Sequence, residues 1–153
     1  MAYYLTFDGI NDYVLAPFSE SMAQTFQIKI RFKTATQPPN DKRMLSLSGT
    51  GSRPLMTFGT GSNNNEGRVF FATDSNSTEI QTNFYFPFGD DVFHDLTLFM
   101  SNGTLTGSVD GGTQFSLGTY TPADYTITQV SFGAIYRSSV SDALEFDLAH
   151  VIF

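Results

Sequence analysis

Polar and apolar side chains alternate without a break along residues 25–33 (TFQIKIRFK). Successive side chains of a β-strand point to opposite faces, so the four apolar residues from Phe26 to Phe32 share one face and the polar residues share the other. Antiparallel sheets often pack one face on the core and leave the other in water. The segment therefore predicts a half-buried strand of an antiparallel sheet.

Short runs of the same kind recur along the chain, separated by turns rich in Gly, Asn, Asp, Ser and Pro, and no segment has a convincing helical period. About a dozen short strands, with turn signals roughly every 8–12 residues, are typical of an all-β, antiparallel two-sheet β-sandwich or jelly roll. With 153 residues and no linker, we expect residues 1–153 to form a single domain. The further strands predicted are 2–7, 12–15, 43–47, 54–58, 67–73, 79–83, 92–101, 103–109, 113–117, 126–134 and 144–153.

Two turns are predicted in detail. Asn102-Gly103 tolerates positive φ at both central positions of a type I′ turn, and therefore predicts a β-hairpin. Asp110-Gly111-Gly112 closes the next hairpin. The polar stretch from Gly59 to Gly67 predicts a mobile loop.

Composition and charge exclude several classes of protein. The chain has no Cys, so we expect neither disulfides nor thiolate metal sites, and sixteen Phe with seven Tyr supply much of the core. A net charge of −7 opposes binding to nucleic acid, and no stretch approaches the roughly 20 apolar residues of a membrane span. Both end segments predict strands and no export signal is apparent, so we expect a self-contained module.

Four segments in order resemble the laminin-G-like branch of the concanavalin A-like lectin and glucanase superfamily. Residues 7–14 (FDGINDYV) are similar to its opening F-D-G-x-x-D-Y-V, and residues 26–33 take the place of its F-T-I-x-x-W-V-K. Residues 94–98 with 103–111 are close to H-x-x-L…G-x-L-x-x-x-V-D-G, and residues 146–153 are close to G-x-I-A-E-V-I-I-Y. Phe32 and Phe93 lie in the two regions where the family commonly carries Trp, and His150 replaces the usual acidic residue of the last strand.

The resemblance implies a concanavalin A-like sandwich, a fold that hosts lectins, hydrolases and structural modules. Related glucanases use an acidic strand motif that needs paired carboxylates, but here Glu145 and Asp147 are followed by His150. We therefore expect no catalytic residues. We also expect no cofactor or metal, since the possible calcium ligands at Asp74-Ser75-Asn76 and Gly89-Asp90-Asp91 match no defined loop. His94 and His150 are expected in structural or surface roles.

Two segments are candidate binding surfaces. The run containing Phe84, Tyr85, Phe86 and Phe88 is either a lid of the core, with only Tyr85 pointing outward, or an aromatic surface that contacts a sugar or a protein. The basic stripe formed by Lys29, Arg31 and Lys33 is either a contact surface or a solvated strand face.

These features favour a non-enzymatic structural or adhesion module that docks on a larger assembly. Cysteine-free modules of this type, without a signal peptide, resemble virion components of tailed phages, such as capsid decoration or tail-associated proteins. The expected partners are other virion or assembly proteins and further copies of the chain, with no nucleic acid and no membrane. The expected location is the virion, after synthesis in the host cytoplasm. The alternative is a carbohydrate-binding, lectin-like module, which would be extracellular.

Overall fold

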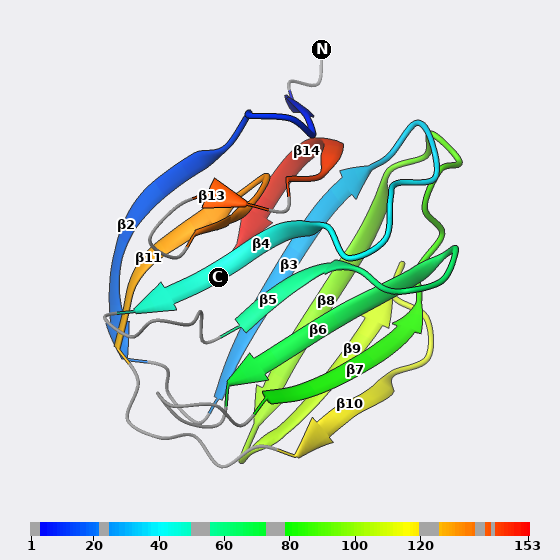
Figure 1. The fold of residues 1–153 in the computed structure, drawn as a ribbon. Coiled ribbons are helices and arrows are strands. Elements are labelled where there is room, and N and C mark those ends of the chain that lie inside the picture. The colour runs from blue at the N-terminus through cyan, green and yellow to red at the C-terminus, as the bar shows by residue number, and fades with distance from the viewer. Residues whose placement is uncertain are drawn as a thin grey trace.

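The computed structural model describes residues 4–21, 25–49, 56–72, 79–119, 126–136, 140–141 and 143–153. Over these ranges the chain forms two six-stranded antiparallel sheets and one two-stranded ribbon (Figure 1). The described ranges contain no helix, and hence none long and apolar enough to cross a membrane. The all-β sandwich predicted from the alternation is confirmed.

The strands of each sheet pair in an order that differs from their order in the chain. Sheet A contains, in spatial order, β1 (Leu5–Asp8), β14 (Glu145–Ile152), β3 (Thr25–Lys33), β8 (His94–Ser101), β9 (Thr104–Val109) and β10 (Phe115–Thr119). Sheet B contains β2 (Val14–Ser21), β11 (Thr126–Phe132), β4 (Arg43–Gly49), β5 (Met56–Thr60), β6 (Glu66–Ala72) and β7 (Glu79–Tyr85). The ribbon pairs β12 (Ile135–Tyr136) with β13 (Val140–Ser141). The edges are therefore β1 and β10 in sheet A, and β2 and β7 in sheet B.

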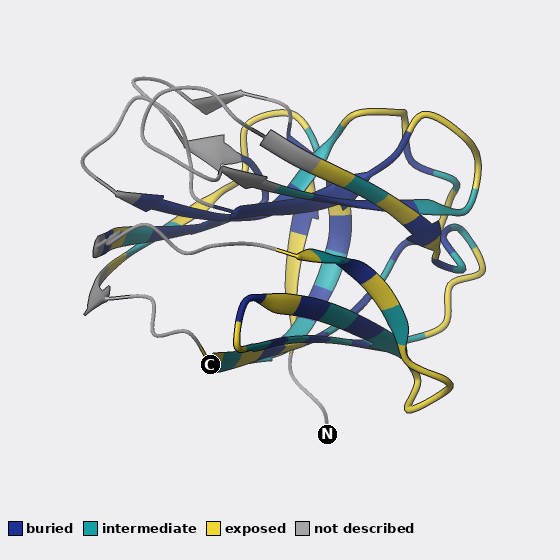
Figure 2. Cartoon of the chain, turned by 90° about the horizontal axis from the view of Figure 1, so that it is seen from below, coloured by how far each residue is buried: buried dark blue, intermediate teal, exposed yellow. Residues whose placement is uncertain are grey.

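Stacked phenylalanines join the two sheets in the core. Phe32 on β3 is fully buried and stacks on Phe86 with 4.6 Å between ring centroids. It also packs in an edge-to-face arrangement with Phe58 on β5, with 5.8 Å between centroids. Such aromatic pairs contribute about 0.5–1.5 kcal/mol beyond the area they bury. Buried positions lie mainly along the strands and exposed ones along the connecting loops (Figure 2).

Both predicted hairpins are confirmed. Asn102 and Gly103 have φ of 46° and 77° between β8 and β9, as a type I′ turn requires. Asp110 and Gly111 have φ of 51° and 67°, and the Gly112 amide donates to the Val109 carbonyl at 2.9 Å between β9 and β10.

Other predicted boundaries are wrong. Residues 12–15 predicted a short strand, whereas β2 runs on through Pro17 to Ser21, because an edge strand tolerates proline. The predicted mobile loop at 59–67 is shortened by β5 and β6, and the Glu66 carboxylate ties it down by accepting from the amides of Ser62 and Asn63 at 2.7 and 3.1 Å. The pattern also gave no signal for β12 or β13. The predicted strand positions 2–3, 54–55 and 73 lie outside the described residues.

The two ends of the sandwich differ. At the β7/β10 end the Thr82 hydroxyl donates to the Leu117 carbonyl at 2.5 Å, which links sheet B directly to sheet A. At the β1/β2 end an apolar cleft separates the sheets. We call these the closed end and the open end.

Candidate functional site

The basic stripe lies on the outer face of sheet A and is largely neutralised. Arg31 pairs with Asp95 at 2.6 Å, and the Lys33 ammonium lies 2.5 Å from the Asp91 carboxylate and 3.7 Å from that of Asp147. The hydrogen bond to Asp91 raises the pKa of Lys33. Among the described residues Lys29 alone of the three has no ion pair, so the stripe is not a free cationic patch.

Phe93 supports this arrangement from β8's entry loop. Its ring lies under both cations, with its centroid 5.9 Å from the Arg31 guanidinium carbon and 5.5 Å from the Lys33 nitrogen. The Tyr4 and Phe93 rings pack edge to face, with 5.8 Å between their centroids. Cation–π contacts at exposed sites contribute about 0.5–1 kcal/mol each, so these residues stabilise the outer face.

The aromatic run divides between the core and the surface. Phe84, Phe86 and Phe88 are buried, and Phe86 is only 1% exposed, whereas Tyr85 is 70% exposed. Their alternation along β7 and its exit matches the expected lid of the core. The expectation that the whole run forms a contact surface is therefore corrected, because the three Phe rings are covered and of the four only Tyr85 can reach a partner.

Tyr85 stands beside a groove of about 420 Å³ near the closed end. The groove lies between the end of β7 and the β9–β10 hairpin. We call it the Tyr85 groove, and its lining residues are Asn83, Phe84, Tyr85, Val109, Gly112, Thr113, Phe115 and Ser116.

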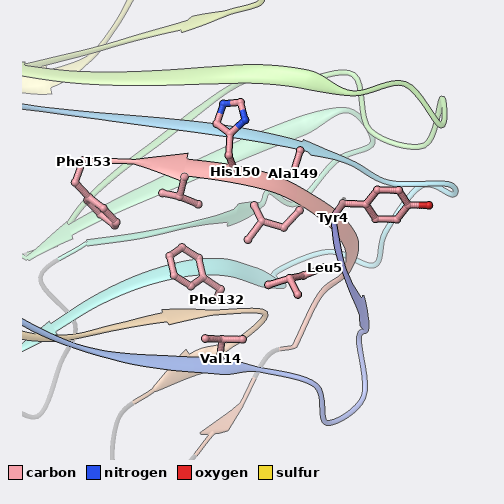
Figure 3. Close-up of a pocket in the computed structure, with 9 residues that line it drawn as sticks. Tyr4, Leu5, Val14, Phe132, Ala149, His150 and Phe153 are labelled. Atoms are coloured by element: carbon pink, nitrogen blue, oxygen red, sulfur yellow. The ribbon is translucent and has the colours of Figure 1, made fainter. Parts of the chain in front are cut away.

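The open end holds an apolar cleft of about 470 Å³ that sequence reasoning missed. Figure 3 shows Leu5, Phe132 and Phe153 in the space between the two sheets, while His150 points away from it. Leu5 is 55% exposed, and Phe153 is also exposed. The lining residues are Tyr4, Leu5, Val14, Phe132, Leu148, Ala149, His150, Val151 and Phe153.

A β-bulge in β14 explains why His150 faces outward. The pairing of β14 with β3 shifts between Leu148, opposite Phe32, and His150, opposite Arg31. The extra residue, Ala149, reverses the alternation, so His150 joins the outer face instead of entering the cleft. The open-end cleft therefore keeps an apolar interior.

The two acidic residues of the β14 motif have different surroundings. Asp147 accepts a hydrogen bond from the Thr6 hydroxyl at 2.7 Å and lies near Lys33, while Glu145 is exposed. Within the part of the chain that the structure describes, no group of three His, Asp or Glu residues is arranged to hold a metal ion. The candidate ligands at 74–76 lie outside the described residues.

His94 is enclosed by two carboxylates. Its Nδ1 lies 2.6 Å from Asp110 and its Nε2 lies 2.9 Å from Asp90, while its ring packs edge-on against Phe86. Burial opposes the charged form, but the hydrogen bonds to Asp110 and Asp90 outweigh it and raise the pKa of His94. The same bonds, together with backbone amides, lower the pKa of both carboxyls despite their partial burial. The cluster joins two loops and has a structural role.

No protein-family model matches the chain, and no curated protein matches its sequence. Solved structures do match its fold. Domains LG4-5 of the mouse laminin α1 chain align with a TM-score of 0.68 and 15% identity, over 98% of this chain and 40% of that one. The chain thus spans two fifths of that laminin structure.

Two further matches have other activities. The CBM40 of the Ruminococcus gnavus IT-sialidase, bound to α2,3-sialyllactose, aligns with a TM-score of 0.59 and 12% identity, over 83% of this chain and 73% of that one. A family 7 alginate lyase in complex with substrate aligns with a TM-score of 0.59 and 13% identity, over 88% of this chain and 62% of that one. The fold is the concanavalin A-like jelly roll. It hosts both binding modules and enzymes, so the site must indicate the function.

Proposed function

We propose that the chain is a non-enzymatic structural and adhesion module that docks on a larger assembly through its open end. The assembly we favour is the virion of a tailed phage, with the chain as a capsid decoration or tail-associated protein present in several copies. The observation that carries the proposal is the concentration of exposed apolar side chains at the open end. We call the exposed apolar residues that line the open-end cleft the open-end face: Tyr4, Leu5, Val14 and Phe153.

The open-end face has the character of a protein-docking surface. Contiguous exposed apolar patches are rare on monomeric proteins and mark interaction sites, whereas scattered single residues need no explanation. Here β1, the start of β2 and the end of β14 bring these residues together around one cleft. A stable interface buries about 800 Å² on each partner and depends on a few aromatic or apolar anchors, a role that Leu5 and Phe153 fit.

Docking is tested with particles of the phage that carries the gene. Mass spectrometry of density-banded particles should detect the chain in amounts comparable with other structural proteins. The purified wild-type chain, added to particles that lack it, should co-sediment with them, whereas the Leu5→Asp variant should not. The wild-type chain and the variant should melt at similar temperatures, because Leu5 is 55% exposed. Val92→Asp is the matched control, since Val92 is 53% exposed and does not line the cleft. Absence of the chain from banded particles would refute the virion role.

Glycan binding is the second candidate function. The specific observation that favours it is the Tyr85 groove, which offers an exposed aromatic ring at the closed end. The match to a carbohydrate-binding module bound to sialyllactose supports the class of ligand but not the site. In this role the chain would be an extracellular or particle-borne lectin-like module.

A further inference from the structure

We propose that the Tyr85 groove binds one uncharged pyranose ring of a glycan, with Tyr85 as the stacking platform. The proposal rests on the second candidate function and names its site and ligand class. It is independent of docking at the open end, because the groove borders β7, β9 and β10 while the open-end face borders β1, β2 and β14.

The exposure of Tyr85 is not explained by packing. Phe84 and Phe86, its neighbours along the chain, are buried, whereas the Tyr85 ring is 70% exposed. Among the described large apolar residues only Ile10, at 80%, is more exposed than Tyr85, and the next most exposed, Leu5 and Ile152, are at 55%. A large ring left in water beside a concavity is the kind of surface that a ligand covers.

The floor of the groove is apolar and held in place from two sides. Phe115 stacks on Phe84 with 4.8 Å between centroids. Its ring also covers the backbone of Gly107, where an added Cβ would lie 2.5 Å from the ring. An apolar floor of this kind suits one C–H face of a sugar ring. The exposed Tyr85 ring can then cover the sugar ring from its other side.

The rim of the groove is polar but carries no formal charge. Thr113 and Ser116 are exposed and offer hydroxyls, Tyr85 offers a phenol, and the eight lining residues include no Asp, Glu, Lys, Arg or His. Hydroxyl groups around an apolar floor complement the hydroxyls around a pyranose. Without a cation on the rim, a carboxylated sugar such as sialic acid would gain no ion pair there, so the ligand is a neutral sugar.

The walls of the groove are preorganised. Asn83 accepts a hydrogen bond from the buried Arg68 guanidinium at 2.9 Å, which fixes the end of β7 beside Tyr85. On the other wall the turn at Asp110 and Gly111 closes with the 2.9 Å bond from Gly112 to Val109. A site that needs little ordering loses less of its interaction energy on binding.

The test is saturation-transfer difference NMR, with titration to obtain Kd, using cellohexaose, N-acetylchitohexaose and maltohexaose as neutral probes and 3′-sialyllactose as the charged probe. At least one neutral probe should bind, through its ring C–H protons. Tyr85→Ala should weaken that binding by about tenfold or more, equivalent to about 1.4 kcal/mol, and Tyr85→Phe should retain it. Tyr13→Ala is the matched control, because Tyr13 is an exposed tyrosine that does not line the Tyr85 groove.

Each of the other outcomes contradicts one claim of the proposal. If no neutral probe binds the wild-type chain, the proposed ligand class is wrong. If a neutral probe binds Tyr85→Ala as tightly as the wild type, the Tyr85 groove is not the binding site, although the chain still binds glycans. If sialyllactose binds more tightly than every neutral probe, the inference from the uncharged rim fails. Co-sedimentation of the chain with particles is measured separately, so none of these results decides docking.

Discussion

At the scale of single residues, His94 ties together two loops of sheet A. Asp90 precedes β8 and Asp110 follows β9, and each contributes one carboxylate to the imidazole. Because both ring nitrogens face carboxylates, the charged imidazolium is the form that satisfies both bonds. The cluster therefore makes the stability of the fold depend on pH near neutrality.

We expect the chain to lose stability as the pH rises through the raised pKa of His94. The folded pKa lies above the unfolded value of about 6.5, so the stabilisation is complete below that pH and is lost above the folded pKa. His94→Asn should lower the free energy of unfolding by about 1–3 kcal/mol near pH 6 and by less at high pH. Thermal unfolding followed by circular dichroism measures both effects. His150→Asn, at an exposed position, is the control, and a constant wild-type midpoint would contradict the prediction.

The alternation of β3 gives a second prediction at this scale. Ile30 is 1% exposed, so Ile30→Asp would place an unpaired charge in the core. The expected loss is several kcal/mol against a total stability of about 5–15 kcal/mol, and the variant should not fold. Gln27→Asp, on the exposed face of the same strand, should melt close to the wild type. A soluble Ile30→Asp variant with a cooperative transition would be inconsistent with the packing described for β3.

At the scale of elements, glycines allow strands to approach closely where side chains would collide. Gly67 on β6 lies opposite Phe84 on β7, and an added Cβ would stand 2.7 Å from the Phe84 ring. Gly59 on β5 lies against the end of the loop that leads into β4, where an added Cβ would stand 1.8 Å from the Lys42 carbonyl oxygen. The Thr60 amide donates to that same carbonyl at 2.9 Å, so the backbone there cannot move away without losing a bond.

Gly59→Ala should therefore destabilise the fold by about 3 kcal/mol or more, because the methyl group meets backbone and not a flexible side chain. Gly111→Ala is the informative comparison. Nothing lies within 4 Å of its added Cβ, so only its φ of +67° opposes the substitution, at a cost of about 1–2 kcal/mol. Chemical denaturation of the two variants measures the difference. Equal losses would show that the contact at Gly59 is relieved by local movement.

At the scale of the whole molecule, the sandwich has two ends with different chemistry. The open end exposes an apolar cleft, and the closed end carries a groove with uncharged polar groups around an aromatic floor. The acidic residues of β14 lie on the outer face of sheet A, away from both hollows, and Asp147 is engaged by Thr6 and Lys33. Neither hollow is therefore lined by the acidic residues of the glucanase-like motif.

We expect no hydrolysis of β-glucan and no cleavage of alginate by the purified chain. Retaining hydrolysis requires two carboxyls about 5–5.5 Å apart across a bound sugar, and His150 stands where the third acidic residue of the motif would be. Reducing-end release and the absorbance of unsaturated uronate measure the two activities. Turnover above background that Glu145→Gln abolishes would contradict the proposal that the chain is not an enzyme.

The sequence by itself determined the all-β class, the buried face of β3 and both tight hairpins. These follow from the period of two along a strand and from the positive φ that Asn-Gly and Asp-Gly tolerate, which are properties of neighbouring residues. It also left the aromatic run open between two interpretations, and only the packing of Phe86 on Phe32 placed its rings in the core.

The tertiary structure alone decided which apolar residues face water. Leu5 and Phe7 share one face of β1 and the same alternation, yet Phe7 is 2% exposed and Leu5 is 55% exposed. Phe7 stacks on Phe146 at 4.6 Å and covers Gly133, whereas Leu5 lines the open cleft. The bulge at Ala149 likewise turned His150 outward. Both outcomes depend on how far strands distant in the sequence extend past one another, which no local pattern encodes.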